Sequence, residues 1–383
     1  MRTAVVLVLA ASSVTGCRLV EPPTVALPPP AVSSPSCTNA SVVATWPVAR
    51  RAAALVAVPT LDFDIAAVVS EIRAGAGGVL LLGHASAPGD LAVRIQSLRS
   101  AAAVRGLPLV MADEEGGGIS RLAGVVGAFP WARTLAATMT PDEARAIGAR
   151  VGRQMRAAGV DIDLAPVLDV DAGVGPNDVN ADGDRSFSGD AATAARYGVA
   201  FMNGLRDGNV VPVVKHFPGL GGTVGNTDDR PASTPPIATL RRVGLVPFET
   251  AIASGAPAVM VANASIPGLT PLPASLSRAT MTGLLRGTLH FRGLVMTDSL
   301  SAGAVRQVTT SIADAAVRAI TAGADMVMYG TALRRGESES TRAAAVATTF
   351  NQVVRALVAD VPTATLDASV LRVLAAKRTQ LCG

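Results

Sequence analysis

Several apolar segments of the sequence end in side chains that could take part in chemistry. Asp298 ends GLVMTDS, and a carboxylate there could attack the anomeric carbon of a sugar or stabilise a cation at that carbon. Alternatively, Asp298 caps a helix, because Asp is common where a strand turns into a helix. Asp113 with Glu115, Asp163 and Asn263 end other such segments. Since buried charges are costly unless they are paired or used, several polar ends together indicate a functional site.

Two basic residues also end an apolar segment, and two more lie in the loops after such segments. Lys215 and His216 end VPVVKHF, although the chain has only two lysines and three histidines. A lysine in an apolar strand indicates a need for a compact donor, such as one that binds sugar hydroxyls, whereas a core histidine is the simpler interpretation of His216. Adjacent strand residues face opposite sides, so we expect one of the two to face the site unless the following loop relaxes this rule. Arg121 in SRL and Arg185 in GDRSF complete the set.

Eight β-rich segments must bring these residues together. Most of them are continuously apolar rather than alternating, which is typical of parallel strands that are covered on both faces. They span residues 54–59, 78–83, 108–115, 160–167, 211–217, 258–265, 293–299 and 325–330.

Helical patterns lie between these segments. The clearest begins at Thr140, with Pro141 in its first turn and Glu143 at the capping-box position, and it can end at Gly159. Eight alternating strands and helices predict an α/β fold, a single (β/α)8 TIM-type barrel that carries its chemistry at the C-terminal ends of the strands. A doubly wound open sheet is the alternative, but no G-x-G-x-x-G motif follows the first strand.

The N-terminal stretch differs from the rest. Residues 1–16 hold one Arg and an apolar run too short to span a bilayer, which predicts a signal peptide. VTGC resembles the lipobox of bacterial lipoproteins, so we expect lipidation at Cys17 rather than an ordinary cleaved signal. Residues 17–36 are rich in Pro and Ser and predict an extended linker. We therefore expect an exported protein, lipid-anchored at the outer face of the bacterial cell membrane, with a barrel domain over residues 37–383.

Cysteine usage and charge limit the partners. Cys37 and Cys382 bracket the predicted domain, and disulfides persist outside the cell, so we expect a bridge between them; two free thiols are the alternative. Three cysteines without metal-type spacing argue against a zinc site. The loop around GDRSF is rich in Asp and Asn but lacks the EF-hand spacing, which argues against a calcium site. The net charge is +4 without a long basic run, which argues against nucleic-acid binding. We expect a monomer that uses no metal and no cofactor.

Five motifs carry a resemblance to a known family. DEEGG…SRL, GVDIDLAPVLDVD, GDRSF, KHFPG and VMTDSL occur in an order and spacing similar to glycoside hydrolase family 3, in particular its single-barrel β-N-acetylhexosaminidases, over roughly residues 45–375. The resemblance implies a retaining glycosidase that acts on terminal β-N-acetylglucosamine of cell-wall or related glycans, including muropeptides. It also implies that Asp298 is the nucleophile. The residues that it implies bind the sugar are Asp113, Arg121, Arg185, Lys215 and His216.

The chain departs from this family after KHFPG. The family has an Asp there and, two residues on, a His that is the general acid/base, whereas this chain has Asn226 and Asp228 at those positions. One interpretation is that Asp228 or its neighbour Asp229 is the acid, because glycosidases usually use a carboxyl group. A second is that the loop only binds sugar and the enzyme acts on substrates with good leaving groups. A third is a sugar-binding or muropeptide-binding lipoprotein that has lost catalysis. We favour an active or weakly active glycosidase, because the nucleophile and sugar-binding positions are all present.

Overall fold

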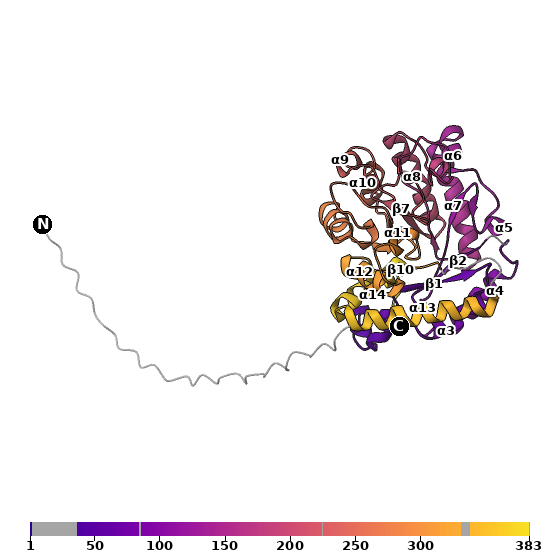
Figure 1. Cartoon of the computed structure of the whole chain (residues 1–383), viewed down its shortest axis with the longest axis vertical. Coiled ribbons are helices and arrows are strands. Elements are labelled where there is room, and N and C mark those ends of the chain that lie inside the picture. Colours follow the sequence, from indigo (N-terminus) through magenta and orange to yellow (C-terminus); the bar gives the residue numbers. More distant parts are fainter. Residues whose placement is uncertain (2–36, 84–85, 224, 331–337, 383) are drawn as a thin grey trace. The chain divides into compact units, whose positions relative to one another are not determined.

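Eight parallel strands form the central sheet, in the order β10-β1-β2-β3-β6-β7-β8-β9 (Figure 1). A parallel bridge between Met296 and Met326 brings the two edge strands together, so this computed structural model has a barrel-like sheet. The strands are β1 (Val56–Leu61), β2 (Gly78–Leu82), β3 (Leu109–Ala112), β6 (Ile162–Asp163), β7 (Val211–Phe217), β8 (Ala258–Val261), β9 (Leu294–Thr297) and β10 (Val327–Met328). Each strand overlaps one predicted segment. The predicted (β/α)8 TIM-type barrel is therefore confirmed, and the doubly wound alternative is wrong.

The structure describes Met1 and residues 37–83, 86–223, 225–330 and 338–382. Cys37–Gly383 form one compact unit, distinct from Met1–Ser36. Cys17, with nearly all of the predicted signal peptide and linker, lies outside the described residues, so the division into domains stays a prediction. Within the described ranges, every helix is too short or too polar to cross a bilayer.

Helices lie outside the sheet and connect its strands (Figure 1). The longer ones are α4 (Leu91–Ser100), α6 (Ala132–Thr138), α7 (Pro141–Ala157), α8 (Ala191–Asp207), α10 (Val246–Ala253), the π-helical η4 (Ala279–Thr288), α12 (Ile312–Ala322), α13 (Glu339–Asp360) and α14 (Thr363–Ala376). The shorter ones are α1 (Asn39–Val43), α2 (Val48–Ala53), η1 (Ile65–Val68), α3 (Val69–Arg73), α5 (Ala123–Val126), η2 (Gly183–Arg185), α9 (Ile237–Leu240), η3 (Ala274–Leu276) and α11 (Gly303–Arg306). A small antiparallel hairpin, β4 (Glu114–Gly116) and β5 (Ile119–Ser120), follows β3.

The predicted start of α7 is confirmed in detail. Thr140 Oγ1 accepts a hydrogen bond from Glu143 N at 3.3 Å, and the Glu143 carboxylate accepts one from Thr140 N at 2.7 Å. Together the two bonds satisfy backbone N–H groups that the first turn of a helix leaves free. Gly159 follows the end of the helix with φ of +89°, a conformation that favours glycine.

The two ends of the barrel unit are joined. Cys37 and Cys382 form a disulfide, with their Cα atoms 5.9 Å apart. Beside it, the Asn39 side chain donates a hydrogen bond to Thr379 O at 2.7 Å and accepts one from Leu381 N at 2.8 Å. The start of the unit and the segment after α14 are therefore held against each other by one covalent bond and two hydrogen bonds.

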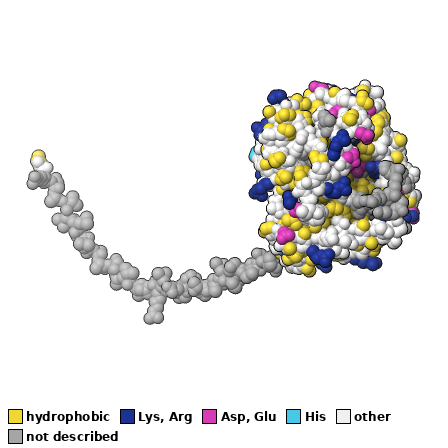
Figure 2. All heavy atoms as spheres, in the orientation of Figure 1, with side chains coloured by type: hydrophobic (Ala, Val, Ile, Leu, Met, Phe, Trp, Pro, Cys, Tyr) yellow, Lys and Arg dark blue, Asp and Glu magenta, His cyan; other side chains and the backbone are white. Residues whose placement is uncertain are grey.

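Charged side chains are mixed on the surface. On the face shown in Figure 2, Lys and Arg lie among Asp, Glu and hydrophobic side chains rather than in one continuous stripe. Of the most exposed large hydrophobic residues of the barrel unit among those described, Val93 lies in α4, whereas Val174 and Val179 lie in the loop between β6 and η2. The expectation that the protein binds no nucleic acid stays a prediction.

Candidate active site

A cavity of about 400 Å³ lies at the C-terminal ends of the strands. Leu82 of β2, Met260 of β8 and Met328 of β10 form part of its wall. A larger cavity, of about 760 Å³, lies beside Val211, where β7 begins, and its lining includes none of the residues predicted to act on substrate. Because barrel enzymes carry their chemistry at the C-terminal ends of the strands, we assign the candidate site to the smaller cavity.

All seven residues predicted to act on substrate line this cavity, although the chain brings them from distant segments. Asp229, the alternative acid, is not among the lining residues. Asp113 and Arg121 flank the β4–β5 hairpin, Arg185 lies in η2, Lys215 and His216 lie at the end of β7, and Asp228 and Asp298 follow β7 and β9. The arrangement agrees with a shared site, and the role of each residue is taken up below as a proposal.

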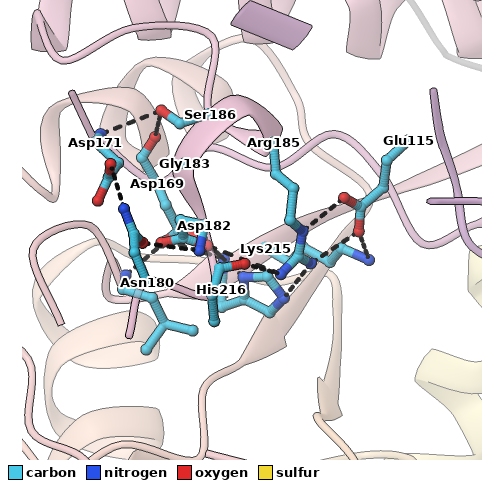
Figure 3. A network of polar contacts seen from close by, with 12 residues as sticks. Glu115, Asp169, Asp171, Asn180, Asp182, Gly183, Arg185, Ser186, Lys215 and His216 are labelled. Carbon is cyan, nitrogen blue, oxygen red and sulfur yellow. Dashed lines mark hydrogen bonds and ion pairs between the residues drawn. The ribbon is translucent and has the colours of Figure 1, made fainter. Parts of the chain in front are cut away.

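Glu115 stands at the centre of an ion-pair network (Figure 3). Its carboxylate accepts hydrogen bonds from Arg185 at 2.8 and 2.9 Å and lies 2.7 Å from Lys215 Nζ. Lys215 Nζ also donates to Asp113 at 2.6 Å. Burial opposes the charge on Glu115, but Arg185 and Lys215 hold the pKa of Glu115 well below its usual range. The network fixes two cationic donors in the wall of the cavity.

His216 is kept neutral by its surroundings. Burial, with the charges of Arg185 and Lys215, lowers the pKa of His216 to about 4. Its Nδ1 lies 2.7 Å from Asp169 Oδ2, and its Nε2 lies 3.4 Å from Arg185 Nη2. Since a guanidinium only donates, we place the proton on Nδ1, from which it is donated to Asp169. A neutral imidazole oriented in this way can bind a sugar, but it is poorly suited to protonate a leaving group at neutral pH.

Lys215 and His216 both face the cavity, contrary to the expectation that only one of them would. The pairing of β7 with β8 is regular at Val213 and Val214 and then shifts before Phe217. Strand alternation holds only where the ladder is regular, so the irregular segment can present two consecutive side chains on one side.

Asp298 lies directly after β9. Its Oδ1 accepts a hydrogen bond of 2.6 Å from Ser299 N. Burial raises the pKa of Asp298, and the negative charge of Asp228 raises it further, whereas Ser299 N–H and Lys215 lower it. Ser299 N–H and the Lys215 ammonium group therefore offset part of the cost that burial places on the charged form of Asp298.

Asp228 is an exposed residue that borders the cavity. Partial burial of its carboxyl raises the pKa of Asp228, and the charges of Asp229 and Asp113 raise it further. The charge of Arg185 lowers it. Two carboxyls that share a cavity do not both ionise easily. Retaining hydrolysis needs one of the two carboxyls ionised and the other protonated, and we assign these two states below as part of a proposal.

One group of residues could in principle hold a metal ion. Among the described residues, Asp169, Asp182 and His216 bring one ligand atom each within 4.8 Å of one another. Asp169 already accepts hydrogen bonds from Leu220 N at 2.6 Å and from His216. Arg185 Nη1 lies 3.9 Å from Asp182 Oδ1, and burial raises the pKa of Asp182 to about 8. A cation there would displace hydrogen bonds and face a guanidinium, so the donor set fits a metal poorly, and the absence of a required metal stays a prediction.

Two residues of the site were not assigned a role from the sequence. Glu115 holds Arg185 and Lys215, and Asp169 orients His216. Glu115 was recognised as a polar strand end, and its contact with the same site could have been predicted because it stands two residues after Asp113 and positions i and i+2 of a strand share a face. Asp169 lies in a loop after β6, where no periodicity would have indicated its partner.

Comparisons with known proteins identify the family of the chain. Residues 62–376 match the model for the glycosyl hydrolase family 3 N terminal domain. The Beta-hexosaminidase LpqI of Mycobacterium tuberculosis is 38% identical over 323 residues, which are 82% of this chain and 78% of that protein. A solved structure of M tuberculosis LpqI aligns with a TM-score of 0.76 at 34% identity, over 89% of this chain and 96% of that one. A Beta-N-acetylhexosaminidase from Beutenbergia cavernae aligns with a TM-score of 0.75 at 32% identity, over 87% and 99% of the two chains. The chain therefore belongs to glycosyl hydrolase family 3 and is a glycosidase with a carbohydrate substrate.

Proposed function

We propose that this glycosidase removes terminal β-linked N-acetylglucosamine with retention of configuration, with Asp298 as the nucleophile and Asp228 as the acid/base. The observation that carries the proposal is that both carboxyls line one cavity whose wall holds fixed cationic donors. The relatives named beta-hexosaminidase and Beta-N-acetylhexosaminidase support an N-acetylhexosamine as the sugar. Cell-wall fragments such as muropeptides contain this sugar and would be within reach of an exported enzyme.

The proposed reaction has two displacements. In the first, an Asp298 oxygen attacks the anomeric carbon while the glycosidic C–O bond breaks, and the Asp228 carboxyl gives its proton to the departing oxygen. In the second, the Asp228 carboxylate takes a proton from water as that water attacks the same carbon. The bond to Asp298 breaks as the bond to water forms, which returns both carboxyls to their starting states and leaves the sugar with its original β configuration.

The remaining residues hold the sugar in this proposal. Lys215 is paired with Asp113, and Glu115 holds both Lys215 and Arg185. These groups can therefore donate to and accept from sugar hydroxyls without first being ordered. Neutral His216 can do the same, while Arg121, which donates to Gly83 O at 3.2 Å, borders the site from the hairpin side. Preorganised groups of this kind favour the transition state because their reorganisation costs little during the reaction.

The proposal is tested with purified protein and a panel of para-nitrophenyl glycosides. Release from the β-N-acetylglucosaminide, with the β-anomer seen first by proton NMR, is the expected result. Release of the α-anomer first would contradict the retaining mechanism, and release only from another glycoside would contradict the sugar. Saturable binding of N-acetylglucosamine without any turnover would instead support the sugar-binding alternative, which the comparisons do not favour.

Replacing Asp228 with Ala tests the acid. We expect kcat/KM, which reports the first displacement, to fall about 10²- to 10⁴-fold for a disaccharide and far less for the para-nitrophenyl substrate, whose leaving group needs little protonation. Because the pKa of Asp228 is raised, its protonated form persists to a higher pH than that of an ordinary Asp. Activity on the disaccharide should fall as the pH rises through that pKa, and this alkaline limb should be absent in the variant. Asp229→Ala, which removes a neighbouring carboxyl outside the cavity, is the matched control. Equal losses of kcat/KM on both substrates in Asp228→Ala would reject the role of Asp228 as the acid.

We also propose the location and form of the protein: a lipid-anchored monomer at the outer face of the cell membrane, with residues 1–16 as signal peptide, residues 17–36 as linker and residues 37–383 as barrel domain. The Cys37–Cys382 disulfide supports an oxidising location. Replacing Cys17 with Ser should move the protein from the membrane fraction to the soluble fraction of expressing cells, as judged by immunoblot. An unchanged membrane fraction would contradict lipidation at Cys17.

A further inference from the structure

The loop that carries Asp228 is docked against the segment that carries Asp298. We define the acid loop as residues 225–230. Gly303 N donates a hydrogen bond of 2.7 Å to Asp228 O, and Ala304 N donates one of 3.1 Å to Thr227 O. Gly303 begins α11, only a short segment after Asp298. The backbone that follows the nucleophile therefore holds the backbone of the proposed acid directly.

The acid loop is a tight turn that keeps its own shape. Asn226 Oδ1 accepts a hydrogen bond from Asp228 N at 3.0 Å. Asn226 O accepts from Asp229 N at 3.2 Å and from Arg230 N at 3.1 Å. A turn closed in this way moves as one piece, so a shift at one contact is passed on to the Asp228 side chain.

Two further hydrogen bonds join the first and last residues of the acid loop to the segment before η2. Gly225 N donates to Val179 O at 3.1 Å, and Arg230 Nη2 donates to Asp178 O at 3.3 Å. The acid loop thus lies between the segment before η2 and the start of α11, and it is bonded to both.

Gly303 is the point at which this packing leaves no room. A Cβ at Gly303 would lie 2.2 Å from Asp229 O, 2.4 Å from Asp229 C and 2.9 Å from Arg230 N, all of which are backbone atoms. Gly303 is buried, and its φ lies outside the left-handed region, so an added methyl group would meet no backbone strain. The only consequence of a side chain there is steric, and it is directed at the residue that follows Asp228.

From these contacts we propose that Gly303 is a positioning residue for catalysis. Gly303 sets the distance between Asp228 and Asp298 by letting the acid loop pack directly on the backbone at the start of α11, shortly after Asp298. The proposal rests on the proposed roles of these two carboxyls. It explains why the acid loop, although surface-exposed at Asp228, has a defined place beside the cavity.

The test replaces Gly303 with Ala. Because a displacement of about 1 Å can cost about 10²-fold, we expect kcat/KM to fall roughly 10²-fold for the disaccharide and less than ~3-fold for the para-nitrophenyl substrate. A loss confined to the substrate that needs protonation is not expected of general misfolding. Gly283→Ala, whose Cβ would meet its nearest atom only at 3.8 Å, is the matched control.

A double variant separates the two proposals. If Gly303 acts through Asp228, Asp228→Ala with Gly303→Ala should be no slower on the disaccharide than Asp228→Ala alone. If Asp228→Ala shows the leaving-group dependence but Gly303→Ala does not, the positioning role is overturned and the acid assignment stands. If Asp228→Ala lacks that dependence, both are overturned.

Folding of the variant is followed by thermal unfolding. Should Gly303→Ala not fold, Arg230→Ala loosens the acid loop from its other side at an exposed position. We expect it to show the same dependence on leaving group with a smaller loss of roughly threefold, because one hydrogen bond to the loop is removed. If Arg230→Ala lowered kcat/KM by the same factor on both substrates, or on neither, the positioning role would be overturned in that case.

Discussion

Replacing Asp298 with Ala should lower kcat/KM by roughly 10⁴-fold on both the disaccharide and the para-nitrophenyl substrate, a scale typical of removing a group that acts in covalent catalysis. Asp298 is the carboxylate with a backbone donor at 2.6 Å and an ammonium group nearby, so its replacement removes the only ionised oxygen that we propose for attack. Initial rates at equal protein concentration, with circular dichroism to confirm folding, provide the measurement.

Azide distinguishes Asp298 from Asp228 by stereochemistry. In Asp298→Ala, azide can take the place of the carboxylate in a single displacement, which gives an α-glycosyl azide from a β-glycoside. In Asp228→Ala, the nucleophile remains, so azide enters in the second of two displacements and gives the β-glycosyl azide. A β-product from Asp298→Ala, or activity within tenfold of the unaltered enzyme, would show that Asp298 is not the nucleophile.

Replacing Glu115 with Ala should lower the free energy of unfolding by about 3–5 kcal/mol, because two cations are left without their buried partner. Glu115 and Lys215 are almost fully buried, and Arg185 is only 13% exposed. Urea unfolding at pH 7 measures the loss. We also expect KM to rise, since Arg185 and Lys215 would no longer be fixed for sugar binding.

The pH dependence of this loss has a definite sign. The pKa of Glu115 is held below its usual range in the folded protein, so its stabilising effect is complete above the pKa of an unfolded Glu and is lost as the pH falls through the folded pKa. The difference between the two proteins should therefore shrink in strongly acidic solution. Asp207→Ala, which breaks the exposed Arg145–Asp207 pair, is the matched control and should change stability far less. Equal effects from the two variants would contradict the role of Glu115.

Much of the fold could be read from local sequence signals. The parallel strands were visible as apolar segments, and the start of α7 was visible in Thr140, Pro141 and Glu143, because these signals depend on neighbours along the chain. Arg121, Arg185 and Asp228 lie away from the ends of the barrel strands and were found through the family resemblance, whereas Asp113, Lys215, His216 and Asp298 were found for a similar local reason. Strand ends in a barrel meet at one face, so a polar residue at each end is enough to place them together.

Contacts between distant segments could not be read in this way. The pairing of Asp169 with His216, and that of Glu115 with Arg185, join residues far apart in the chain and depend on the exact path of two loops. The shift in β7 that turns Lys215 and His216 to one side has no counterpart in the apolar pattern. The packing of Gly303 on the acid loop is likewise invisible, since a glycine at the start of a helix has several ordinary explanations.

The joined ends of the barrel unit have a mechanical consequence. A pull on the chain before Cys37 would reach both the first helix and the segment beyond α14, because the bond to Cys382 connects them. The disulfide would then share the tension between the two ends of the unit, so that neither end could be unfolded without the other. Reducing that bond would leave the two hydrogen bonds of Asn39 and the contact between α1 and α14 to hold this end, so the unit would withstand such a pull less well in a reducing medium.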